Sequence, residues 1–201
     1  MCATTTWLTG SGVNTQTTGN ATQNGIKFIA NSSGGQSYFI DDLYILNTSG
    51  SVNNTFLGEC RILMALPNAD SGSVSTNSQW TTSSGTVHNT RVNENPPDDD
   101  TTYVSSATAG QIDTYKFATV TPTGAVAGVQ TTLCARKDDV GGRTICAEYR
   151  GGGANYDGAN NFSPGSSYLM FRQIYEVDPA TGLAWNGTGI NAGEFGIKCI
   201  A

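Results

Sequence analysis

The chain has 201 residues and a formal net charge of −6 at pH 7; 37% of the residues are hydrophobic, 13% are charged and 25 are glycines. This length supports one or two globular domains. The sequence contains no run of about 18 consecutive apolar residues, which a membrane-spanning helix requires. A phosphate backbone binds clustered Lys and Arg rather than an acidic surface. We therefore expect neither a membrane nor nucleic acid among its partners.

The composition predicts an all-β protein. Abundant Gly, Thr, Ser and Asn with few charged residues is typical of short strands joined by tight turns. Apolar runs or alternation predict nine strands, at residues 5–8, 26–30, 38–46, 56–66, 113–120, 126–137, 144–150, 168–177 and 195–200. Because few amphipathic helices separate them, we expect an antiparallel β-sandwich rather than a parallel sheet with crossover helices.

The acidic stretch NENPPDDDTTY, residues 93–103, is the first candidate for a metal site. It lacks the DxDxDG spacing and the distal glutamate of a calcium loop. Pro96 and Pro97 instead stiffen the backbone, and the residues that follow are typical of capped turns. The pattern favours a structural loop, with a weak cation site as the alternative.

Residues with catalytic chemistry are sparse in this sequence. His88 is the single histidine, and its polar surroundings predict an exposed loop residue. No Cys/His spacing of a zinc site is present. A polysaccharide hydrolase would need two carboxylates that face each other across a cleft, but acidic residues in strands more often face solvent. The candidates for such a pair are Glu59, Asp113, Glu148 and Glu176. We expect no catalytic residue, no metal and no cofactor.

Residues 126–150 predict a β-hairpin that turns at DDVGG, where Gly141 or Gly142 adopts a positive φ. Closure of this hairpin would place Cys134 opposite Cys146 at a separation that a disulfide tolerates. The chain has five cysteines, and its first residues lack the segments of a secretory signal, which favours reduced thiols. The sequence therefore leaves two alternatives for this pair, a Cys134–Cys146 disulfide or two packed thiols.

One short helical element is expected near the C-terminus, in DPATGLAWNGTGINAGEFG. Asp178 is placed to cap a turn that Pro179 opens. The glycines that follow keep any helix in this segment short.

A family resemblance is carried by four runs: FIDDLYILNTSGSVNNTFLGECRI, PPDDDTTYVSSATAGQIDTYKF, GVQTTLCARKDDVGGRTICAEYRGGGANYDG and IYEVDPATGLAWNGTGINAGEFGIK. They resemble bacteriophage virion proteins of the tail or tail-fibre-like kind, with a lectin-like jelly roll of the concanavalin or laminin-G type. The resemblance implies a structural protein on the exterior of the virion, assembled in the host bacterial cytoplasm with other virion proteins. Its place is either a tail appendage or a capsid cement protein.

The resemblance also predicts the domain organisation. A complete lectin-like sandwich precedes the IDDLY strand in such relatives, whereas here only about forty residues do. We assign residues 1–55 to a truncated lectin-like β segment and residues 56–201 to a jelly-roll-like sandwich. Three strands enclose no core alone, so the first segment is expected to pack between subunits. The expected interface residues are Phe28, Phe39, Leu43 and Ile45. A homo-oligomer follows, and threefold symmetry is favoured because phage fibres and cement proteins commonly use it.

A carbohydrate-binding adhesin that recognises a host-surface glycan is the alternative function. Sugar platforms present aromatic rings on a loop or an open face. The candidate rings are Trp80, Tyr103, Tyr156 and Trp185.

Overall fold

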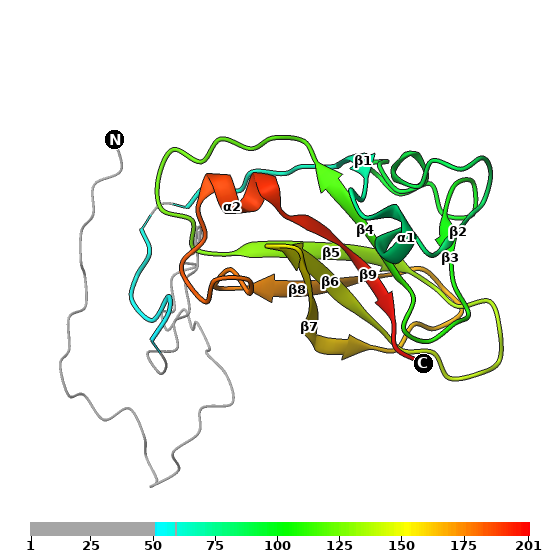
Figure 1. Cartoon of the computed structure of the whole chain (residues 1–201). Coiled ribbons are helices and arrows are strands. Elements are labelled where there is room, and N and C mark those ends of the chain that lie inside the picture. Colours follow the sequence, from blue (N-terminus) through cyan, green and yellow to red (C-terminus); the bar gives the residue numbers. More distant parts are fainter. Residues whose placement is uncertain (1–50, 59) are drawn as a thin grey trace, which may run out of the picture. The chain divides into compact units, whose positions relative to one another are not determined.

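The computed structural model describes residues 51–58 and 60–201, which belong to one compact unit that begins at Leu46 (Figure 1). The described chain is all-β and antiparallel with little helix, and the predicted sandwich class is confirmed. The predicted strands at 5–8, 26–30 and 38–46 lie outside these residues. The boundary at residues 55 and 56 stays a prediction.

The larger sheet has five antiparallel strands in the order β1-β4-β9-β6-β7. They are β1 (Pro67–Asp70), β4 (Ile112–Phe117), β9 (Glu194–Cys199), β6 (Ile145–Gly151) and β7 (Ala154–Phe162). β9 is the last strand of the chain, yet it lies at the centre of the sheet between β4 and β6. The sheet is therefore complete only when the C-terminal strand has paired.

A second sheet consists of β5 (Val129–Ala135) and β8 (Leu169–Tyr175), which pair in register from Val129 opposite Tyr175 to Ala135 opposite Leu169. This sheet packs as a second layer against β9, β6 and β7 (Figure 1). Side chains in the middle of β5 alternate between the two faces, since Thr131 is buried while Gln130 and Thr132 are exposed. A two-stranded ribbon, β2 (Thr81–Thr82) with β3 (Val104–Ser105), lies apart from both sheets.

The helices are short: α1 (Val74–Asn77), the 3-10 turn η1 (Asn89–Arg91) and α2 (Gly187–Ala192). The predicted turn at Asp178 is present, since its Oδ1 accepts the Ala180 N–H at 2.9 Å. The helix itself begins later, at Gly187, and the side chain of its N-cap residue, Asn186, accepts the Gly189 N–H. Within residues 51–58 and 60–201, no helix has both the length and the apolar character that crossing a membrane requires.

The core between the two layers is aromatic. Its buried members are Tyr149 on β6, Tyr175 on β8, Phe195 on β9 and Trp185 in the loop before α2. The Tyr149 ring lies 5.0 Å from the Phe195 ring and 5.3 Å from the Trp185 ring, centroid to centroid. Trp185 Nε1 donates to the carbonyl oxygen of Tyr175 at 2.8 Å, so the indole keeps its hydrogen bond inside the core.

The predicted hairpin of residues 126–150 is wrong, because β5 and β6 belong to different sheets. The hairpin that forms joins β6 to β7 through Gly152 and Gly153, whose φ angles are +59° and +85°. Two positive φ angles in a two-residue loop match the twist of paired strands, which favours this turn over the longer DDVGG segment. DDVGG instead connects the two layers.

The predicted strand positions are also wrong in two other places. Residues 56–66 form no strand where the structure describes them, and β1 begins only at Pro67. β7 lies between the predicted strands at 144–150 and 168–177, where no strand was predicted.

A substitution at Gly196 tests the central pairing of β9 with β4. A Cβ atom on Gly196 would lie 1.9 Å from the carbonyl oxygen of Asp113, which is backbone and cannot move aside. We expect Gly196→Ala to lower the free energy of unfolding by about 3 kcal/mol or more in urea titrations followed by circular dichroism.

Gly142→Ala is the matched control, because no atom lies within 4 Å of the added Cβ. Its free energy of unfolding should change by about 1 kcal/mol or less. Equal unfolding midpoints for the two variants would show that β9 does not approach β4 this closely.

Candidate functional site

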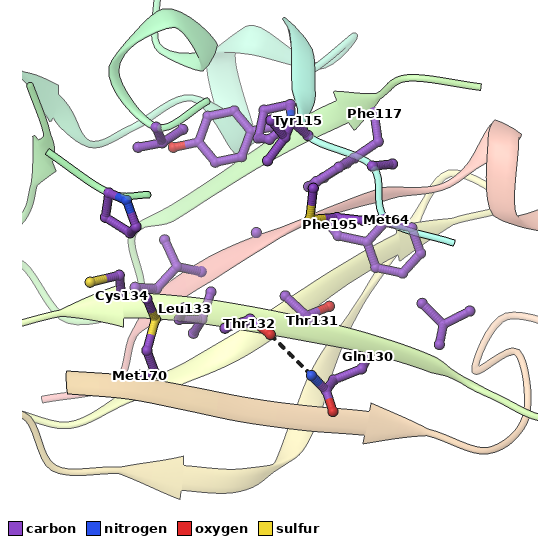
Figure 2. Close-up of a pocket in the computed structure, with 18 of the residues that line it drawn as sticks. Met64, Tyr115, Phe117, Gln130, Thr131, Thr132, Leu133, Cys134, Met170 and Phe195 are labelled. Carbon is purple, nitrogen blue, oxygen red and sulfur yellow. Dashed lines mark hydrogen bonds between the residues drawn. The ribbon is translucent and has the colours of Figure 1, made fainter. Parts of the chain in front are cut away.

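A large hollow opens between β5 and the facing strands β4 and β9, with a volume of about 1550 Å³. We call it the interlayer hollow. Figure 2 shows Phe117 from β4, Phe195 from β9 and Leu133 from β5 on its walls, with Met64 from the segment before β1. These side chains are apolar, whereas other parts of the lining are charged, among them Asp99, Arg136 and Lys137. The apolar part of the wall therefore suits an apolar occupant.

Exposed apolar side chains lie along the segment that borders this hollow. Leu57, Ile62, Leu63 and Met64 all line the hollow, and we call them the apolar strip. Ile62 is 93% exposed and Met64 is 68% exposed. Grouped apolar exposure of this kind marks interaction surfaces in soluble proteins.

The smaller sheet has open edges next to the hollow. Within the part of the chain that the structure describes, β5 and β8 pair only with each other. Each therefore has one edge at which no other described strand is paired, and another strand can add there. An added strand from outside would extend this layer.

The four aromatic residues proposed for glycan contact do not form one platform. Trp185 is buried in the core, and Tyr156 packs against the core cluster with its ring 5.9 Å from that of Tyr149. Trp80 and Tyr103 both line the interlayer hollow. Trp80 Nε1 donates to the Gln111 carbonyl oxygen, while Tyr103 is exposed.

Cys134 and Cys146 are free thiols in the structure. The hairpin that would have paired them does not form: Cys134 lies opposite Met170 on β8, and Cys146 lies opposite Lys198 on β9. Of the two alternatives, the structure therefore has the free thiols rather than the disulfide. Burial raises the pKa of Cys146 to about 11, which keeps this thiol protonated at neutral pH.

The acidic stretch at residues 93–103 uses its carboxylates within the chain, as expected of a structural loop. Asp98 accepts the backbone N–H of Thr102 at 3.1 Å, and Glu94 accepts the hydroxyl of the same threonine at 2.7 Å. Asp100 pairs with Arg136 at 2.7 Å. The hydrogen bond from Arg136 holds the pKa of Asp100 below its usual value. This pair ties the loop to the end of β5.

His88 is not the exposed loop residue that the sequence predicts. Its side chain is 13% exposed, and Nδ1 lies 3.0 Å from Oδ2 of Asp113 on β4. The hydroxyl of Tyr115 donates to the same carboxylate oxygen at 2.8 Å. Asp70 in turn accepts the backbone N–H groups of His88 and Asn89. Pairing of β1 with β4 therefore brings the histidine to a carboxylate that local sequence cannot reveal.

Strand carboxylates are buried more often than the sequence indicates. Asp113 and Glu148 are fully buried, so the expectation that they face solvent is wrong, whereas Glu176 is exposed as expected. Burial, then the nearby Asp157 carboxylate, raises the pKa of Glu148 to about 8. Glu194 was missed: it is buried on β9 and accepts the hydroxyls of Ser71 at 2.6 Å and Thr114 at 3.0 Å. Glu59 lies outside the described residues.

The predicted interface residues Phe28, Phe39, Leu43 and Ile45 lie outside the described residues and stay predictions. No protein-family model, no curated protein and no solved structure matches this chain.

Removal of the His88 side chain tests the contact with Asp113. The buried carboxylate would keep its bond from Tyr115 but lose the imidazole, which leaves part of its desolvation uncompensated. We expect His88→Ala to lower the free energy of unfolding by about 1–3 kcal/mol in urea titrations at neutral pH.

A double-mutant cycle supplies the control. Because Asp113→Asn removes the buried charge, the same His88→Ala change should cost less in that background. Additive effects of the two changes would show that the two side chains are not coupled.

Proposed function

We propose that this protein is a non-enzymatic structural subunit on the exterior of a bacteriophage particle, as a tail appendage or a capsid cement protein. The observation that carries the proposal is the apolar strip beside the interlayer hollow. A subunit built for assembly has a reason to expose such a surface, because a neighbouring subunit covers it.

The energetics of the apolar strip favour association. Full burial of an aliphatic side chain of this size contributes roughly 1.5–3 kcal/mol. Ile62 and Met64 are largely exposed, so most of that contribution is still available to an interface. The open edges of β5 and β8 add backbone hydrogen bonds for a strand supplied by a neighbour.

The occupant that we propose is the N-terminal segment of a second copy of the chain. The run YFIDDLYIL, residues 38–46, has the apolar composition of a strand, and Phe39, Leu43 and Ile45 belong to it. Such a segment suits both features of the site, an apolar hollow and a sheet edge that accepts a strand. The proposed assembly is a homo-oligomer, with a trimer favoured.

The virion context rests on the resemblance to phage tail and tail-fibre-like proteins. That resemblance also supplies the jelly-roll and lectin-like description, the other virion proteins as partners, and assembly in the host cytoplasm. The all-β antiparallel architecture agrees with this family description at a coarser level.

Sedimentation of the purified full-length chain tests the assembly. We expect an oligomer at micromolar concentration, and we expect Ile62→Asp combined with Met64→Asp to shift it towards the monomer. Two charges in the apolar strip would have to be buried without partners, which costs several kcal/mol per interface. Phe39→Asp with Leu43→Asp should have the same effect if the N-terminal segment is the occupant.

Val140→Asp is the matched control, because Val140 is fully exposed and lies outside the walls of the hollow. It should leave the sedimentation coefficient unchanged. A folded wild-type monomer at micromolar concentration would contradict the proposal. Dissociation by the Val140 variant, with the strip variant still assembled, would place the interface elsewhere.

Glycan binding is the second candidate function, favoured by Trp80 and Tyr103 on the walls of the hollow. An exposed ring of this kind stacks on the apolar face of a sugar. A glycan array probed with the wild type and with Tyr103→Ala is the test, and we expect any hit to weaken about tenfold in the variant. Absence of any hit would remove this candidate and leave the structural role.

A further inference from the structure

Three chemically reactive side chains meet on one face of the larger sheet. Glu148 on β6 lies opposite Asp157 on β7, and Cys146 stands two residues before Glu148 on the same face of β6. The Cys146 thiol and one oxygen from each carboxylate all lie within 4.8 Å of one another. β9 adds Lys198, which lies directly opposite Cys146.

Glu148 is the unusual member of this group. The residue is fully buried, and among the described residues neither of its carboxylate oxygens has a hydrogen-bond partner. Buried carboxyl groups in folded proteins are paired, hydrogen-bonded, bound to a metal or held as the neutral acid, because an unpartnered charge costs several kcal/mol. A cation at this position would let Glu148 ionise. Its carboxylate is aimed at a buried thiol and at Asp157, both of which can share a cation with it.

We propose that Cys146, Glu148 and Asp157 bind a divalent transition-metal ion, with Zn²⁺ as the favoured class. The thiolate selects a borderline-soft ion over Mg²⁺ or Ca²⁺, which take oxygen ligands only. Three protein ligands leave a fourth tetrahedral position for water.

The charges of the group balance around such an ion. Metal binding displaces the protons that burial keeps on Cys146 and Glu148. The thiolate and the two carboxylates then carry three negative charges, and a divalent ion together with the Lys198 ammonium supplies three positive ones. Lys198 Nζ lies 2.7 Å from both oxygens of Asp157. A carboxylate has about four lone-pair sites, so Asp157 can hold this ammonium and a metal at once.

Metal binding requires the three ligand atoms to move slightly closer to one another. Zinc lies about 2.3 Å from sulfur and about 2.0–2.2 Å from carboxylate oxygen, which puts tetrahedral ligand atoms about 3.3–3.7 Å apart. The ligand atoms lie within 4.8 Å of one another, so an approach of about 1 Å completes the site. The Asp157 side chain is 50% exposed and can make this movement, which also gives the ion its entry from solvent.

Cobalt is the spectroscopic probe for this test. Co²⁺ replaces Zn²⁺ in tetrahedral sites, and a thiolate ligand gives it a charge-transfer absorption in the near ultraviolet. The protein should carry Cys60→Ser, because that thiol is exposed and could bind the probe, and Cys2→Ser, because Cys2 lies outside the described residues. We expect one Co²⁺ per chain with this absorption, its displacement by Zn²⁺, and a melting temperature raised by several degrees.

Variants assign the ligands. Cys146→Ser should abolish the absorption, and Asp157→Asn should weaken Co²⁺ affinity by more than the about 10–100-fold that loss of an outer-shell partner costs. Because Asp157 is on the surface, its variant is expected to fold even if a change at the buried Cys146 does not. Asp139→Asn, an exposed aspartate paired with Arg143, is the matched control and should bind like the wild type.

Three outcomes overturn the proposal: no Co²⁺ bound at one equivalent, an affinity that Asp157→Asn leaves unchanged, or an absorption that survives Cys146→Ser. None of these measurements depends on the oligomeric state, so failure here is distinguishable from failure of the proposed assembly.

Discussion

The packing of the Tyr149 ring is the contact on which the rest of this structure depends. The ring is 1% exposed and touches the rings of Tyr156, Tyr175, Trp185 and Phe195. These four residues come from β7, from β8, from the loop before α2 and from β9. One side chain therefore joins the central strands of the larger sheet to the second layer. The Tyr149–Trp185 pair is edge-to-face, with an interplanar angle of 77°, and such pairs contribute beyond area burial.

The opposite face of the same strands is polar, and it is also buried. β6 is buried at nearly every position, including Cys146 and Glu148, which alternate with Ala147 and Tyr149. Near Glu194 the polar groups are satisfied by the segment at Ser71, which closes over the sheet. The two carboxylate oxygens of Glu148 have no such hydrogen-bond partner among the described residues. On this polar face the Glu194 carboxylate is hydrogen-bonded within the chain, whereas the Glu148 carboxyl group has no hydrogen-bond partner among the described residues. A ligand would therefore stabilise the structure most at Glu148.

Strand positions followed from the sequence where apolar residues are dense. β4, β5, β6, β8 and β9 match predicted segments to within one residue at each overhanging end, because apolar side chains recur along these strands. The sequence pattern does not predict β7, because most of its nine residues are exposed and polar and its pairing depends on the Gly152–Gly153 turn. The strand prediction for residues 56–66 was wrong for the opposite reason. They are apolar enough for a strand, but within the described chain they border a hollow and have no strand beside them.

The candidate sites were harder to predict because each is assembled from distant parts of the chain. His88 reaches Asp113 only after β1 pairs with β4, and Asp157 reaches Glu148 only after the β6–β7 turn closes. Alternation on a strand did carry one usable signal, since Cys146 and Glu148 must share a face in any strand. What composition cannot show is which face is covered. β6 is buried on both faces, so its polar residues are buried too, whereas on β5 Thr131 is buried while Gln130 and Thr132 are exposed. Burial of a polar strand residue thus depends on what covers its face of the sheet, and segments distant in the sequence supply that cover.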